Sequence, residues 1–168
     1  LLRSKFLHDL GPTLPAPSAA AILTGIETLS LRVAKAQDNV LALTRALAAH
    51  PAVATVHHPS EHTHPDHALA ARDFPAGTGC VFSFDLVDPA AVPQLVDSLQ
   101  LFALAANIGD TRSLVVHPAA MTHCRLNASQ LATAGIKAGT LRISVGLEDA
   151  ADLVADLLGA LDALGAAS

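Results

Sequence analysis

One helix-favouring stretch constrains this chain more than any other feature of its sequence. From about Ser18 to His50 there is no proline, the single glycine is Gly25, and alanine and leucine are abundant. Apolar residues recur there at helical spacing, at Ile22, Ile26, Leu29, Val33, Val40, Leu43 and Leu47. The pattern predicts one helix of roughly 30 residues, against a mean of about 11–12 in globular domains. We expect a helix of this length to bridge two lobes or two subunits.

The segments on either side of this helix predict a mixed fold. The proline-rich stretch 11–18 ends any helix before it, and Pro51 ends the long helix. β-branched and aromatic residues predict strands near 53–56, 80–86, 101–104, 113–116 and 140–145. Apolar spacing predicts helices near 68–73, near 89–98 and from 148 or 149 onward. This order favours an α+β fold with a small, mostly antiparallel sheet covered by helices.

Composition narrows the functional classes. The 168 residues are 51% apolar, which suffices for one sizeable core, and the net charge of −5 argues against a nucleic-acid partner. No apolar run reaches the roughly 18 residues that a membrane span needs, and the N-terminus lacks a signal-peptide pattern. Cys80 and Cys124 are too far apart for a zinc motif, so we expect reduced thiols and a cytoplasmic protein. A first residue other than Met suggests a fragment, a truncated gene or a processed product.

A histidine-rich loop raises the question of a metal. It contains His57, His58, His62, His64 and His67. Imidazoles are good ligands for zinc and related ions, but the spacing matches no established zinc motif. A solvated loop is the favoured interpretation and metal binding is the alternative, so no metal ligand is predicted.

Arg142 is the strongest candidate for binding chemistry. It alternates with Leu141 and Ile143, so its side chain is expected on the opposite face of its strand. Asn107 and Thr122 lie in loops beside predicted strands, and a strand arginine among small polar residues suits bidentate capture of a carboxylate. The alternative is a surface arginine paired with an acidic side chain. No GxSxG elbow or glycine-rich phosphate loop is present, so the residues alone indicate an anion site without a complete catalytic set.

Three blocks in the right order resemble a known family. The stretch 10–17 with 25–32 resembles "LGxxLSPFNA…GLETLSLR" of O-acetylhomoserine sulfhydrylases, members of the Cys/Met-metabolism pyridoxal-phosphate family. The stretch 106–123 resembles the "ANVGDxxSLxxHPAxxTH" block, and 141–149 resembles "xRLSVGLED". Together the blocks cover nearly the whole chain, which is far more specific than one short motif.

The resemblance implies a fold and roles for individual residues. Residues 1–168 would form the C-terminal lobe of a fold-type-I pyridoxal-phosphate transferase, with 1–50 as N-terminal segment and linking helix and 51–168 as substrate-binding lobe. Arg142 would clamp the α-carboxylate of an amino-acid substrate, Asn107 would stand beside the same carboxylate, and Thr122 would lie in a loop that approaches the active site. The complete enzyme would be a homo-oligomer that contains pyridoxal 5′-phosphate.

The departures from the family pattern concern the cofactor. The family's Schiff-base lysine lies N-terminal to the first block, and Lys5, Lys35 and Lys137 match nothing in its motif. The phosphate-binding turn and the stacking tyrosine of the missing N-terminal lobe are also absent from these residues. We therefore expect the 168 residues alone to be inactive. The resemblance leaves open acetyl- against succinyl-homoserine as donor, a cystathionine γ-synthase or lyase, and a non-catalytic interaction remnant.

Overall fold

The computed structural model describes residues 2–165, which form two compact units, 1–31 and 32–168. In the first unit, a π-helix over Leu2–Leu7 runs into α1 (His8–Leu10), which ends at Gly11. Gly11 has a φ of 59°, and its N–H donates to the Leu7 carbonyl, a left-handed turn that glycine adopts without strain. α2 (Ala16–Glu27) then begins with proline in its first turn. The predicted boundary at residue 50 stays a prediction.

The predicted single long helix is two helices along the chain. α2 ends at Glu27, and α3 (Leu29–Ala48) begins two residues later. Thr28 between them has φ −108° and ψ 6°, and its N–H donates to the Ile26 carbonyl. A β-branched residue is stiff in a helix, and a polar one competes for backbone groups, so Thr28 is a natural position for this break.

A five-stranded sheet organises the second unit, as predicted. The strands are β1 (Val53–His57), β2 (Val81–Leu86), β3 (Ala103–Leu104), β4 (Leu114–Val116) and β5 (Thr140–Ser144). Their order is β1-β2-β5-β4-β3, and every pair is antiparallel except β3–β4. The predicted α+β fold with a mostly antiparallel sheet is therefore confirmed.

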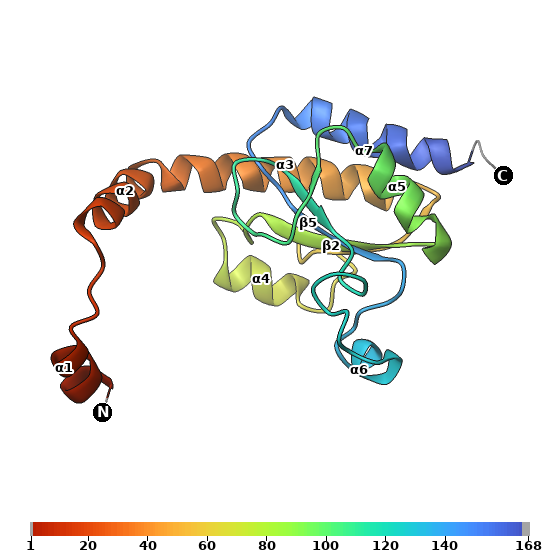
Figure 1. The fold of residues 1–168 in the computed structure, drawn as a ribbon. Coiled ribbons are helices and arrows are strands. Elements are labelled where there is room, and N and C mark those ends of the chain that lie inside the picture. The colour runs from red at the N-terminus through yellow and green to blue at the C-terminus, as the bar shows by residue number, and fades with distance from the viewer. Residues whose placement is uncertain (1, 166–168) are drawn as a thin grey trace. The chain divides into compact units, whose positions relative to one another are not determined.

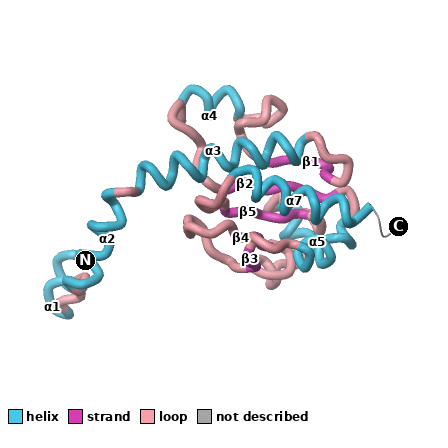
Figure 2. Tube along the Cα trace, turned by 90° about the horizontal axis from the view of Figure 1, so that it is seen from above, coloured by secondary structure: helices cyan, strands magenta, loops and turns pink. Residues whose placement is uncertain are grey.

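The helices of the second unit lie on both sides of this sheet. They are α3, α4 (His67–Asp73), a 3₁₀ turn (Pro89–Ala91) that leads into α5 (Val92–Ser98), α6 (Ala128–Thr133) and α7 (Ala150–Gly165). α3, α5 and α7 lie on one side of the strands, and α4 and α6 lie on the other (Figure 1). Seen from above, α3 and α7 lie over the strands (Figure 2). None of the helices within residues 2–165 is long and apolar enough to cross a bilayer. α6 was not predicted, although Asn127 and Gln130 form a capping box at its start.

The apolar core lies between the sheet and α3, α5 and α7. Alternate strand residues face these helices and are buried, among them Phe82, Phe84, Leu141, Ile143 and Val115. Their helical partners are Val40, Leu43, Leu47, Val92, Leu95, Leu153, Leu157 and Leu161. Period-2 alternation places Arg142 and Asp85 on the opposite face of the sheet, beside buried Val116 of β4, and that face holds the candidate site.

Candidate functional site

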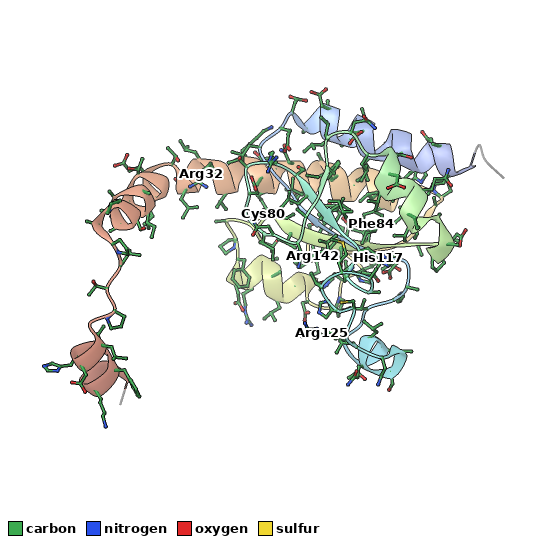
Figure 3. All side chains as sticks on the ribbon, viewed as in Figure 1. Arg32, Cys80, Phe84, His117, Arg125 and Arg142 are labelled. Atoms are coloured by element: carbon green, nitrogen blue, oxygen red, sulfur yellow. The ribbon has the colours of Figure 1, made fainter. Side chains whose placement is uncertain are left out.

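Arg142 lies in the middle of the polar face of the sheet. β5 is the central strand, and it carries Arg142 (Figure 3). Arg142 stands between Ser83 of β2 and Val116 of β4. Its neighbours Leu141 and Ile143 are fully buried in the core on the other side, whereas Arg142 is half-buried. The alternation within five residues thus fixes which side of the sheet receives the guanidinium.

The Arg142 guanidinium has unused hydrogen-bonding capacity. Nη2 donates to the Asn107 carbonyl over 3.4 Å, a long and weak bond, and the buried Nε has no partner. No carboxylate among residues 2–165 forms an ion pair with it. A buried donor without a partner costs about 1–3 kcal/mol, so this arrangement favours an acceptor supplied from outside these residues.

A clamp of hydrogen bonds holds the loop that carries Asn107. Both oxygens of Glu148 accept from Ser113, from its N–H at 2.6 Å and from its hydroxyl at 2.9 Å. The same hydroxyl accepts from the Gly146 N–H at 2.9 Å, and Ser113 is fully buried. Gly109 donates to the Ser144 hydroxyl at 3.1 Å. The loop 107–113 is therefore tied to the end of β5, two residues beyond Arg142.

Asn39 anchors this clamp from α3. Its side-chain amide donates to the carbonyls of Gly146 at 3.0 Å and Glu148 at 2.9 Å. Neither this residue nor the positioning role of Glu148 was predicted from the sequence. A signal for Asn39 existed, because it lies on the same helical face as Ala36 and Leu43, where a polar residue is exceptional.

Thr122 lies apart from the Arg142 contact. It is exposed, and its hydroxyl is 2.9 Å from Nδ1 of His123 within the loop between β4 and α6. The loop is fastened by the His123 N–H, which donates to the Pro118 carbonyl, and by His117, whose Nε2 lies 2.9 Å from the Ala138 carbonyl. The structure thus joins Arg142 to the main chain of Asn107 and shows no hydrogen bond from either to Thr122.

A second polar cluster on the same face surrounds Asp85. Its carboxylate is 3% exposed and accepts from the Thr140 hydroxyl at 2.6 Å and from Nζ of Lys137 at 2.8 Å, while Nε2 of His57 lies 2.8 Å away. Burial raises the pKa of Asp85, but the hydrogen bonds from Lys137, Thr140 and His57 together hold it below the ordinary 3.8. The cluster engages Lys137, so this lysine has a structural role in the fold.

The Asp85 cluster makes stability depend on pH. The pKa of Asp85 is lower in the folded than in the unfolded chain. Ionised Asp85 therefore contributes fully to the free energy of unfolding above pH 3.8, and this contribution is lost as the pH falls toward the lower folded pKa. We expect Asp85→Asn to cost about 2 kcal/mol at neutral pH and progressively less in acid, measured by urea unfolding. Asp38→Asn, at an exposed position on α3, is the control. Equal losses from Asp85→Asn at neutral and strongly acidic pH would contradict this assignment.

Solved structures of other proteins share this fold. A putative O-acetylhomoserine (thiol)-lyase from Campylobacter jejuni that carries N′-pyridoxyl-lysine-5′-monophosphate superposes with a TM-score of 0.89 at 36% identity, over 96% of this chain and 38% of its own. Cystathionine γ-synthase from Xanthomonas oryzae gives 0.84 at 43% identity, over 91% and 40%. The fold is therefore that of one portion of a pyridoxal-phosphate-dependent enzyme, as expected for a C-terminal lobe.

Sequence relatives narrow this class to one family. The model of the Cys/Met metabolism PLP-dependent enzymes matches residues 2–162, and the chain belongs to this family. O-acetyl-L-homoserine sulfhydrylase of Leptospira meyeri is 38% identical over 95% of the chain, and O-succinylhomoserine sulfhydrylase of Pseudomonas aeruginosa is 38% identical over 95%. The chain spans only 36% and 40% of the length of these two relatives.

The family's cofactor does not fit the residues described here. Lys137 is committed to Asp85, and the chain has no tyrosine that could stack on a pyridine ring. The described residues thus provide a candidate anion site and no cradle for pyridoxal phosphate.

Proposed function

We propose that this chain binds the α-carboxylate of an amino-acid substrate within a larger pyridoxal-phosphate-dependent enzyme. The observation that carries the proposal is the half-buried Arg142, whose Nε has no partner and whose Nη2 makes one long contact with Asn107. A guanidinium offers two parallel N–H groups to a carboxylate, and the free Nε leaves this fork available. Asn107 would stand beside the bound carboxylate, and Thr122 would contribute from its exposed loop.

The reaction that we propose for the complete protein is a γ-replacement. O-acetyl-L-homoserine would react with sulfide or methanethiol to give homocysteine or methionine, and Asn107 with the "NxGDxxSL" block supports this branch over the γ-synthases and lyases. Pyridoxal phosphate, held by residues outside this chain, would act as the electron sink. The chain's own contribution would be to orient the substrate through its carboxylate. We propose a homo-oligomer and no turnover by the 168 residues alone.

The test is to read and express the complete open reading frame that contains these codons. We expect an in-frame lysine block upstream, a purified product that holds pyridoxal phosphate, and faster formation of homocysteine from O-acetylhomoserine than from O-succinylhomoserine. The 168-residue chain with added cofactor serves as the control and is expected to be inactive. Cystathionine formation as the faster reaction would overturn the sulfhydrylase assignment. A stop codon upstream would favour an interaction remnant.

A further inference from the structure

Two histidines of the loop before α4 meet face to edge. His67 is the first residue of α4, and His62 precedes it by five positions. Nδ1 of His62 lies 3.1 Å from Nε2 of His67, and the ring centroids are 4.5 Å apart at an interplanar angle of 63°. This juxtaposition depends on the turns of the loop, since a spacing of five is not a helical pair motif. We propose that His62 and His67 bind one divalent transition-metal cation of the Cu²⁺, Ni²⁺ or Zn²⁺ class.

The protonation of His67 is fixed by the backbone. Its Nδ1 lies 2.8 Å from the Pro59 carbonyl oxygen. A carbonyl only accepts, so Nδ1 carries the proton and the lone pair of Nε2 points toward His62. A backbone carbonyl on the far nitrogen is the arrangement that orients metal-binding histidines and sets their tautomer.

The distance between the two facing nitrogens suits a shared metal. Imidazole nitrogens bind zinc at about 2.0–2.1 Å. When the angle between the two nitrogen–metal bonds lies between the square-planar and the tetrahedral value, the two nitrogens are therefore about 2.9–3.4 Å apart. The observed 3.1 Å falls in this range. When both rings are neutral in the metal-free protein, Nδ1 of His62 carries the proton that bridges the two nitrogens. On binding, that proton moves through water to the exposed Nε2 of the same ring, and both Nδ1 of His62 and Nε2 of His67 donate lone pairs to the cation.

The remaining coordination positions fall to water. Within residues 2–165 no three histidine, cysteine, aspartate or glutamate side chains are grouped to hold one metal, so the protein supplies two ligands. Neutral imidazoles favour copper over nickel and zinc, and they bind calcium and magnesium poorly because these ions prefer oxygen. A bound cation would join the loop 58–66 to the first turn of α4 and stabilise both.

The test uses the untagged 168-residue chain and CuCl₂, NiCl₂, ZnCl₂ and MgCl₂ as probes. We expect one equivalent of Cu²⁺ to bind, Tm to rise with Cu²⁺, Ni²⁺ and Zn²⁺ but not with Mg²⁺, and affinity for Cu²⁺ to fall by about tenfold or more in His62→Gln and in His67→Gln. His8→Gln, at an exposed histidine beside Asp9, is the matched control and is expected to bind as the unaltered chain does.

A second measurement uses the unaltered chain, so its result does not depend on whether the variants fold. In the proton NMR spectrum, traces of Cu²⁺ are expected to broaden the ring signals of His62 and His67 before those of the seven other histidines of the chain. Unchanged affinity in His62→Gln, or first broadening at a histidine outside this pair, would overturn the proposal.

Discussion

Gly146→Ala is expected to destabilise the folded chain by about 3 kcal/mol or more, because the new methyl group has no room. An alanine Cβ at this position would lie 2.4 Å from the Thr111 carbonyl oxygen and 2.5 Å from the Arg112 carbonyl carbon. Both contacts are backbone atoms, and the Thr111 carbonyl already accepts from the Leu147 N–H at 2.9 Å. Relief of the clash would therefore break the clamp around Ser113. The measurement is urea unfolding followed by circular dichroism.

Gly159→Ala is the control for this prediction, with an effect of opposite sign. Gly159 lies within α7, and an added Cβ there meets nothing within 4 Å. Alanine is a better helix former than glycine, so this variant is expected to gain about 0.5–1 kcal/mol. A Gly146→Ala chain with the same urea midpoint as the unaltered chain would show that the segment 109–113 is free to shift away.

Arg142→Leu is expected to lower kcat/KM of the complete protein by about a hundredfold or more, since loss of a buried carboxylate partner costs about 2–5 kcal/mol. The carboxylate is bound before and during the reaction, so the change should appear mainly in KM. Arg142→Lys keeps the charge without the planar fork and should recover only part of the loss. The measurement is steady-state kinetics with O-acetylhomoserine and sulfide.

Stability distinguishes binding by Arg142 from a structural role. The guanidinium makes one contact of 3.4 Å and leaves Nε unpaired, so Leu at this position should leave the free energy of unfolding unchanged or raise it. Arg45→Leu, at an exposed position of α3, should leave both kinetics and stability unchanged. An Arg142→Leu protein with ordinary KM but lowered stability would mean that the arginine serves the fold.

Local patterns were sufficient to predict the five strands, helices α4, α5 and α7, and the position of Arg142. Alternation along 140–145 placed Leu141 and Ile143 in the core and Arg142 opposite them, and the structure agrees. The break at Thr28 was missed because composition does not reveal which single residue leaves the helical conformation. α6 was missed because its six residues bury nothing and so carry no periodic signal.

Hydrogen-bond partners that are far apart in the sequence could not be predicted from local patterns. Glu148 reaches Ser113 across 35 positions, and Asn39 reaches Gly146 across 107. These contacts depend on where α3 packs against the end of β5, which no local propensity encodes. The His62–His67 contact is short in sequence, yet it depends on loop turns between the two residues. Substrate roles for Arg142, Asn107 and Thr122 stay predictions until the kinetic experiments are done.

The strand order also determines when the site can exist during synthesis. β5 is last of the strands along the chain but central in the sheet, and it alone joins the β1–β2 pair to the β4–β3 pair. While Thr140–Ser144 is still inside the ribosome, the β1–β2 pair and the β3–β4 pair therefore have no strand between them to join them into one sheet. Pairings between residues so distant in sequence form slowly. Because Arg142 arrives on that same closing strand, no unfinished chain can present the proposed anion site to the small molecules around it.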